Sequence, residues 1–346
     1  MTCTTLLPIS VKPVITAAQA TNLNPLYYRL HHDSLSTKVK RKLGILNASN
    51  SLDRRLELSP YRSANLNDVE AIGLTPDSGL SSQQMEILLD RMPNLRWVYW
   101  QRTGTENMHC ELLKARGIAL SNSGGLVSRS VAEMNLGCII AQAKRLPDHI
   151  QLQRRRRWKT LYCEDLSSQT VGIIGTGNIA SQTARLCHAL SMRVTAASRN
   201  PTRFQDTKHT YDRIYHLHDE LDILLHEADY VVVAVPLNEE TRNLIGMKQF
   251  KAMRSSATLI NTARHQIIDE NALFNALSSN LIAAAYLDVL FDRRLYFWDR
   301  IYRTKHLYIT HYSAAHFRNK QQKALQSFLH GLKQEAKTGT FPDRVV

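Results

Sequence analysis

The chain has 346 residues, of which 43% are hydrophobic and 7% aromatic, as expected for a globular protein of two domains. Lysine and arginine outnumber aspartate and glutamate by 44 to 30, and the resulting net charge of +14 favours anionic ligands. No run of about 18 apolar residues is present, which excludes a membrane span, and five scattered cysteines without a CxxC motif argue against a disulfide framework and a metal site.

Residues 1–40 are expected to form an N-terminal extension. They include Ala18-Gln19-Ala20, which resembles a signal cleavage site. Prolines interrupt the apolar stretch before it, and no basic segment precedes that stretch. We therefore expect a cytoplasmic protein.

Short apolar strands alternate with helical segments between residues 41 and 145. The predicted strands are 43–46, 69–74, 95–100 and 118–120, with a helix at 83–92. A long helical stretch follows at 128–144, and Pro147 is expected to end it. This alternation predicts a parallel sheet covered by helices.

The densest basic cluster lies at 154–157 and is followed by Trp158 and Lys159. We interpret it as a solvated bend between the two domains. Nucleic acid is an unexpected partner, because no helix-turn-helix, RRM or zinc-finger pattern accompanies the cluster.

Residues 170–180 carry the most informative pattern of the chain. An apolar run breaks into Gly175-x-Gly177-x-x-Ala180 and continues as a helical stretch. Gly175 permits a tight turn, Gly177 lets the backbone approach a pyrophosphate, and Ala180 lets the helix pack on the strand. A helix that begins here directs its free N–H groups toward an anion. The pattern predicts a dinucleotide site.

The next strand, 192–197, ends at Ser198 and Arg199. Folds that prefer NAD place an acidic residue here to bond the ribose 2′-hydroxyl, whereas an arginine accommodates a 2′-phosphate. Ser198-Arg199-Asn200, followed by Arg203, lacks the acid and supplies two cations. This predicts NADP(H) as the preferred cofactor, with NAD(H) as the alternative, and reduction as the physiological direction.

The βα alternation continues beyond residue 170. The predicted strands are 171–174, 193–197, 230–235, 258–261 and 282–287, with helices at 221–228 and 269–277. A last strand at 307–310 precedes a polar helix at 318–337. Because that helix is too polar to extend the nucleotide sheet, we expect the chain to return to the first domain.

Five stretches in order carry motifs of a known family: 102–107 (Arg-Thr-Gly-Thr-Glu-Asn), 170–199, 228–241, 260–270 and 283–289. Together they resemble the D-2-hydroxyacid dehydrogenase family over roughly residues 65–316. The resemblance implies an α/β fold in which a Rossmann doubly wound parallel sheet is inserted into a smaller flavodoxin-like α/β domain. It implies a substrate domain of residues 41–145 and 312–346, a dinucleotide-binding domain of residues 146–311, and a homodimer.

The resemblance also implies the ligand contacts. Backbone amides of Thr103 and Gly104 would hold the substrate carboxylate, and Arg264 would bind the carboxylate and the keto oxygen, for which a planar guanidinium is suited. The residues expected to contact the cofactor are Gly175, Thr176, Gly177, Asn178, Ile179, Ser198, Arg199, Val235, Pro236, Thr262, Ala263 and Asp288.

The chain departs from the family at the catalytic pair. The family carries a glutamate that orients a histidine. In this chain Arg293 occupies the glutamate position and Tyr312 the histidine position, and His311 occupies the position of the proline that precedes the histidine. His265 replaces the glycine after the arginine, and Arg294 replaces a proline.

Three explanations remain open. In the first, Tyr312 and Arg293 form a new proton donor, since a cation favours the phenolate form of a nearby phenol. In the second, a one-residue shift lets Asp292 and His311 rebuild the acid and imidazole pair, which requires a slip near Thr310. In the third, the simple hydride transfer is lost, and the chain is a sensor, a scaffold or a reductase of a different acceptor.

We expect an oxidoreductase acting on CH-OH groups, which reduces a 2-oxo acid to a 2-hydroxy acid with an altered proton donor. If Arg264, His265, Arg293 and Arg294 face one cleft, their charge suits an acceptor with a second anionic group, or one carried on an acidic protein.

Overall fold

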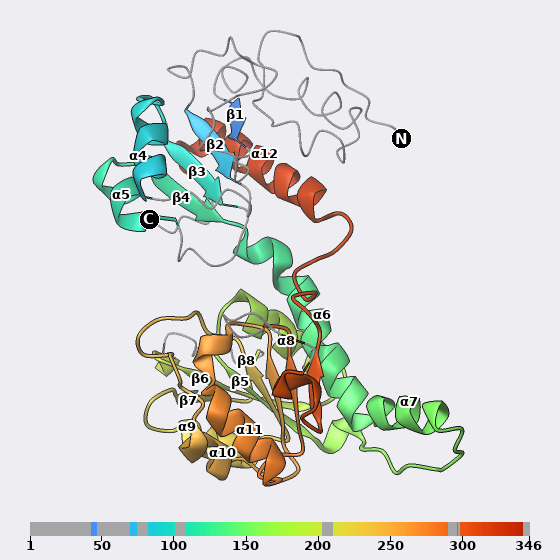
Figure 1. The fold of residues 1–346 in the computed structure, drawn as a ribbon. Coiled ribbons are helices and arrows are strands. Elements are labelled where there is room, and N and C mark those ends of the chain that lie inside the picture. The colour runs from blue at the N-terminus through green and yellow to red at the C-terminus, as the bar shows by residue number, and fades with distance from the viewer. Residues whose placement is uncertain are drawn as a thin grey trace. The chain divides into compact units, whose positions relative to one another are not determined.

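The computed structural model describes residues 43–46, 70–74, 82–100, 108–202, 210–289, 296 and 298–341. The chain divides into two compact units (Figure 1). The first takes residues up to Leu126 and from Asn319 onward, and the second is Val127–Arg318. Most of the helix α6 (Gly124–Ala143) packs on the second sheet and belongs to the second unit. The domain bounds of 41–145 with 312–346, and of 146–311, stay a prediction.

The first unit contains a parallel sheet in the order β1-β2-β3-β4. Its strands are β1 (Leu43–Leu46), β2 (Ala71–Leu74), β3 (Trp97–Trp100) and β4 (Ala119–Asn122), and its helices are α4 (Ser82–Asp90), α5 (Cys110–Ala115) and α12 (Lys320–Thr338). On one face, Trp97 stacks on Phe328 of α12 with 5.0 Å between ring centroids. The chain therefore returns to the first sheet after leaving the second unit.

The second unit contains seven parallel strands in the order β11-β10-β9-β8-β5-β6-β7. They are β5 (Thr170–Ile174), β6 (Arg193–Ser198), β7 (Arg213–His216), β8 (Tyr230–Val233), β9 (Thr258–Asn261), β10 (Ala284–Leu287) and β11 (Leu307–Ile309). The chain runs outward from β5 to β7 and then begins β8 on the other side of β5. Such a reversal opens a crevice at the carboxyl ends of the strands, where ligands bind in this architecture.

Helices cover both faces of the second sheet (Figure 1). The helices of the second unit are α6, α7 (Leu146–Arg154), α8 (Asn178–His188), α9 (Leu221–Glu227), α10 (Met247–Ala252) and α11 (Glu270–Ser278), with 3-10 turns at Leu166–Ser168, His265–Ile267 and Arg300–Tyr302. Buried residues of α9, α10 and α11 pack on one face of the sheet, and those of α6 and α8 pack on the other. This confirms the predicted α/β class with a doubly wound parallel sheet.

One local prediction was wrong, and one strand was missed. Pro147 does not end the long helix, which stops at Ala143, but lies in the first turn of α7. Proline is accepted there because the first N–H groups of a helix have no intrahelical partner. Strand β7 was not predicted, since it is a short edge strand with an exposed first residue. Among the described residues, no helix combines the length and the apolar character that crossing a bilayer requires.

Candidate functional site

The turn between β5 and α8 shows why two glycines are needed. Gly175 has φ of 114°, and a Cβ atom there would lie 2.5 Å from the carbonyl oxygen of Ala234. A side chain is therefore excluded by both backbone strain and contact. Gly177 is exposed and precedes the first residue of α8, and a Cβ atom there would meet no heavy atom within 4 Å. The space above Gly177 is left open to a ligand.

The first turn of α8 has the character of an anion site. Gly177 caps the helix without a side-chain hydrogen bond, and the first turn, which begins with Asn178 and Ile179, contains no acidic residue. Ala180 is fully buried and packs the helix closely on the sheet. The free N–H groups and the helix dipole thus face the crevice without a competing carboxylate in that turn.

A cavity of about 230 Å³ lies at this position, above the carboxyl ends of β5, β6 and β8. It brings together seven of the residues expected to contact a cofactor: Gly175, Thr176, Gly177, Ser198, Arg199, Val235 and Pro236. It is also lined by residues that the sequence analysis missed: Ala197, Asn200, Leu217, Ala234, Asn238 and Thr241. Leu217 follows β7, so it was missed together with that strand.

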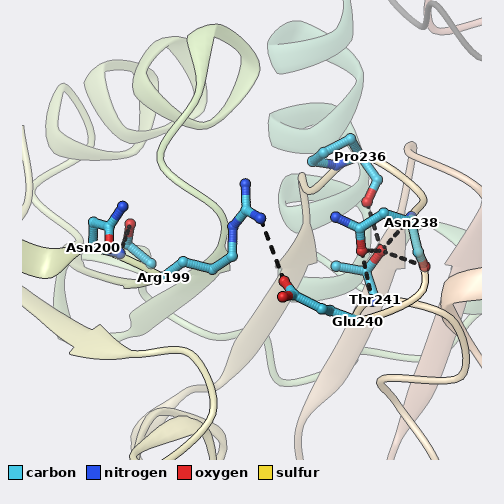
Figure 2. Close-up of polar contacts among 7 residues, drawn as sticks. Arg199, Asn200, Pro236, Asn238, Glu240 and Thr241 are labelled. Atoms are coloured by element: carbon cyan, nitrogen blue, oxygen red, sulfur yellow. Dashed lines mark hydrogen bonds and ion pairs between the residues drawn. The ribbon is translucent and has the colours of Figure 1, made fainter.

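One wall of the cavity is a rigid turn from Pro236 to Thr241. The hydroxyl of Thr241 donates to the carbonyl oxygen of Pro236 at 2.7 Å. The backbone N–H of Asn238 donates to Thr241 Oγ1 at 2.8 Å, and the backbone N–H of Thr241 donates to Asn238 Oδ1 at 2.9 Å (Figure 2). Because the side chain of Thr241 is almost fully buried, these bonds fix the wall.

The opposite wall follows β6. Ser198 is buried, and its hydroxyl accepts a hydrogen bond from Thr176 Oγ1 at 3.3 Å and from the backbone N–H of Asn200 at 3.3 Å. Arg199 is exposed, and its Nη1 donates to Glu240 Oε2 at 3.3 Å. No local sequence pattern marks Glu240, because it belongs to a turn far along the chain from Arg199.

Arg264 follows the carboxyl end of β9, and the fully buried Asn261 holds its loop. Asn261 Oδ1 accepts from the backbone N–H of Ala263 at 3.0 Å, and Asn261 Nδ2 donates to the carbonyl oxygen of Arg264 at 2.9 Å. The Arg264 guanidinium donates to the carbonyl oxygen of Ala263 at 2.9 Å and is half-buried. The Asn-x-x-Arg spacing thus has a structural reason, because the asparagine side chain shapes the loop that carries the arginine.

A buried polar network connects two predicted cofactor residues through α6. Thr262 Oγ1 donates to Asn135 Oδ1 at 2.9 Å, and Asn135 Nδ2 donates to Thr183 Oγ1 at 3.1 Å. Thr183 in turn donates to the carbonyl oxygen of Ile179 at 2.9 Å. Asn135 is fully buried. In the sequence, Asn135 was recognisable as a polar residue on the apolar face of the long helix.

Asp288 organises the turn that carries His311 and Tyr312. Its Oδ1 accepts from Thr310 Oγ1 at 2.6 Å and from the backbone N–H of Ser313 at 2.8 Å. The backbone N–H of Tyr312 donates to the carbonyl oxygen of Asp288 at 2.7 Å. His311 and Tyr312 both have positive φ, of 53° and 59°, and both are exposed.

The carboxyl ends of parallel strands meet at one edge of a sheet. The nucleotide turn follows β5, Arg199 follows β6, Arg264 follows β9, and Tyr312 follows β11. The fold therefore places the predicted cofactor, substrate and proton-donor positions of the second unit at the same edge. Thr103, Gly104, Asp292, Arg293, Arg294 and Arg203 lie outside the described residues.

The chain matches a known family over the region that contains this site. A model described as the NAD-binding domain of D-isomer specific 2-hydroxyacid dehydrogenases matches residues 136–314 of the chain. The chain is also 35% identical over 217 residues to the glyoxylate/hydroxypyruvate reductases B of Salmonella typhi and Salmonella typhimurium. That match covers 61% of this chain and 65% of each relative, which is just under two thirds of their length.

Solved structures show the same fold. The TT0316 protein of Thermus thermophilus is 25% identical with a TM-score of 0.66, covering 80% of this chain and 86% of that one. A D-isomer specific 2-hydroxyacid dehydrogenase of Lactobacillus delbrueckii ssp. bulgaricus in its NAD-complexed form is 24% identical with a TM-score of 0.68, covering 80% and 87%. One from Xanthobacter autotrophicus, in complex with NADPH and MES, is 21% identical with a TM-score of 0.68, covering 82% and 86%.

Proposed function

Because the chain belongs to the D-isomer specific 2-hydroxyacid dehydrogenase family, whose NAD-binding model matches more than half of it, we propose that it is an NAD(P)H-dependent reductase of a 2-oxo acid. The observation that carries the proposal is the cavity over Gly175 and Gly177, at the strand edge that also bears Arg264. The reductases that it resembles are named after glyoxylate and hydroxypyruvate, which are small 2-oxo acids.

The residues around the cavity fit a dinucleotide. The open N-terminal turn of α8 suits a pyrophosphate, and the exposed Arg199 beside the buried Ser198 suits a 2′-phosphate. We therefore favour NADP(H) over NAD(H) as the cofactor. When bound, the reduced nicotinamide supplies the hydride that converts the keto group into a hydroxyl group.

The proposed substrate contact is Arg264. A guanidinium binds a carboxylate through two parallel hydrogen bonds, and the Asn261 side chain positions the loop that presents it. Thr103 and Gly104, whose backbone amides complete the proposed carboxylate site, belong to the part of the chain that the structure does not describe.

The proposed proton donor is Tyr312. Its side chain is 50% exposed at the functional edge of the sheet, so the phenol is accessible to an incoming substrate. The hydrogen bond from Thr310 to Asp288 fixes the end of β11 in register, which disfavours the slip needed to pair His311 with Asp292. The first of the three explanations is therefore favoured over the second.

A homodimer is part of the proposal. The segment of residues 145–165, here called the arm, contains α7, which has no buried residue. Trp158 is fully exposed and Tyr162 is 92% exposed, and Figure 1 shows α7 extending away from the sheet of the second unit. Exposed aromatic side chains in one segment are typical of an interaction surface, and we propose that a second copy covers them. A cytoplasmic location and delivery of the acceptor by an acidic carrier protein remain predictions.

The test is oxidation of NADPH and NADH in the presence of glyoxylate, hydroxypyruvate and a dicarboxylic 2-oxo acid. We expect turnover with at least one acceptor, a loss of about 100-fold or more in Arg264→Ala, and a similar loss in Tyr312→Phe. Tyr302→Phe is the matched control, because Tyr302 is 51% exposed, and it should change the rate by less than about twofold.

Two outcomes would contradict the proposal. Unchanged activity in Tyr312→Phe would exclude the phenol as the donor and return the role to His311. Nucleotide binding without turnover of any acceptor would favour the third explanation, a homologue that binds dinucleotide as a sensor or scaffold.

A further inference from the structure

An ion pair bridges the two walls of the nucleotide cavity. Figure 2 shows Arg199, from the end of β6, and Glu240, from the turn after β8, pointing toward one another. The distance from Arg199 Nη1 to Glu240 Oε2 is 3.3 Å. Arg199 lines the cavity, as do Asn238 and Thr241 next to Glu240.

This pair contributes little to the stability of the fold. The side chain of Arg199 is 57% exposed and that of Glu240 is 51% exposed. Exposed pairs of this kind contribute little, because water screens them and both side chains lose freedom. An anionic ligand can therefore replace the carboxylate at small cost.

The backbone of Glu240 cannot move away from Arg199 as easily as the Glu240 side chain can. The adjacent Thr241 is 2% exposed, and its hydroxyl and N–H groups are engaged with Pro236 and Asn238. The backbone of Glu240 thus stays near Arg199 whether or not the two side chains remain paired. The carboxylate therefore stays within reach of the position where a 2′-phosphate is expected.

We propose that Glu240 is a specificity-determining residue that competes with the 2′-phosphate of NADPH for Arg199. The inference rests on the proposed function. A 2′-phosphate must break the ion pair and then lie near the carboxylate, whereas a free 2′-hydroxyl can donate to Glu240 while the pair persists. Glu240 thereby supplies, from across the cavity, the acidic group that the end of β6 lacks.

The test is calorimetric titration of the full chain with NADPH and with NADH, in the wild type, Glu240→Gln and Glu239→Gln. Glu239 is the matched control, because it is an exposed neighbour and its replacement changes the net charge equally. In Glu240→Gln, the ratio of the NADH to the NADPH dissociation constant should rise about threefold to tenfold. In Glu239→Gln, it should change by less than about twofold.

An equal rise in both variants would show a general effect of charge and overturn the inference, as would an unchanged ratio in Glu240→Gln. The proposed function is tested separately by the wild type. If it binds neither nucleotide, the function and this inference both fail, whereas binding of both nucleotides with no response to Glu240→Gln contradicts the inference alone. The half-exposed position of Glu240 should leave the unfolding midpoint unchanged, which a denaturant titration checks.

Discussion

Gly175 and Gly177 lie two residues apart in one turn, but different forces select them. Gly175 is required by the fold itself, because its φ of 114° and the nearby Ala234 carbonyl group exclude a side chain. Gly177 has ordinary extended geometry and open space around it. Glycine is accepted at this N-cap position, and a ligand approaching the start of α8 gives a further reason for it.

The two positions should therefore respond differently to alanine. Gly175→Ala should lower the free energy of unfolding by about 2 to 4 kcal/mol, from backbone strain and overpacking. Gly177→Ala should keep the free energy of unfolding within about 1 kcal/mol of the wild type, since alanine is a poorer N-cap, but it should bind NADPH at least about tenfold more weakly. Urea unfolding and calorimetry measure the two effects. Equal destabilisation by both substitutions, or unchanged NADPH affinity in Gly177→Ala, would contradict this assignment.

Asp288 shows how one residue can serve the local structure of a site. Two successive residues, His311 and Tyr312, adopt left-handed backbone conformations, which cost about 1 to 2 kcal/mol each. The buried Asp288 carboxylate offsets this cost by accepting hydrogen bonds from Thr310 and Ser313. The resemblance assigned Asp288 to the cofactor, and the structure shows its bonds to the turn of the proposed donor.

At the scale of elements, strands and helices with strong apolar patterns were predictable, and those with weak patterns were not. Strands β5, β8 and β10 are buried along their whole length, so each appears in the sequence as a largely apolar run. The edge strand β7 has one fully buried residue of four, and α7 has none. Their patterns therefore carry little signal of periodicity.

Helices α6 and α8 each bury a cysteine, Cys138 and Cys187, in the core of the second unit. Burial, with a smaller contribution from Asp288, raises the pKa of Cys138 to about 12, and burial raises the pKa of Cys187 to about 12, from a usual 9.0. The folded state thus keeps two protons that the unfolded state releases above about pH 9. Their contribution to stability is fully present below about pH 9 and is lost as the pH rises toward about 12.

The prediction is a free energy of unfolding that falls by about 1.4 kcal/mol per pH unit for each buried thiol in this range. Urea unfolding between about pH 8 and about pH 11 measures the slope. The Cys138→Ala, Cys187→Ala double variant should show a shallower slope than the wild type. Cys163→Ala is the control, since Cys163 is exposed and should leave the slope unchanged. Equal slopes in all three proteins would exclude the thiols as the cause.

At the scale of the whole molecule, the arm is the part of the second unit whose apolar side chains the core of that unit does not bury. Leu146 and Ile150 of α7 are 45% and 51% exposed, and the aromatic side chains of Trp158 and Tyr162 are almost entirely exposed. The basic run 154–157 lies within the same segment, where the sequence analysis expected a solvated bend. An apolar surface next to these charges is better explained by a partner than by solvent alone.

If the protein is a homodimer, sedimentation velocity should give a molecular mass twice that of one chain. The Ile150→Asp, Trp158→Asp double variant should shift the protein toward the monomer, because charged groups would be buried without partners at the interface. Tyr302→Asp introduces a charge at an exposed aromatic outside the arm and should remain dimeric. A monomeric wild type, or a dimer that both substitutions leave intact, would exclude the arm as the interface.

The sequence by itself determined the α/β class, the family and the nucleotide turn, because these depend on local patterns: buried parallel strands, the spacing of small residues and the order of short motifs. Only the tertiary structure decided which distant residues share the cavity. Leu217, Asn238 and Glu240 reach the nucleotide site because the strand order reverses between β5 and β8. Asn135 reaches Thr262 across 127 positions of the chain for a similar reason. Contacts of this kind arise from how elements pack, which no short stretch of sequence encodes.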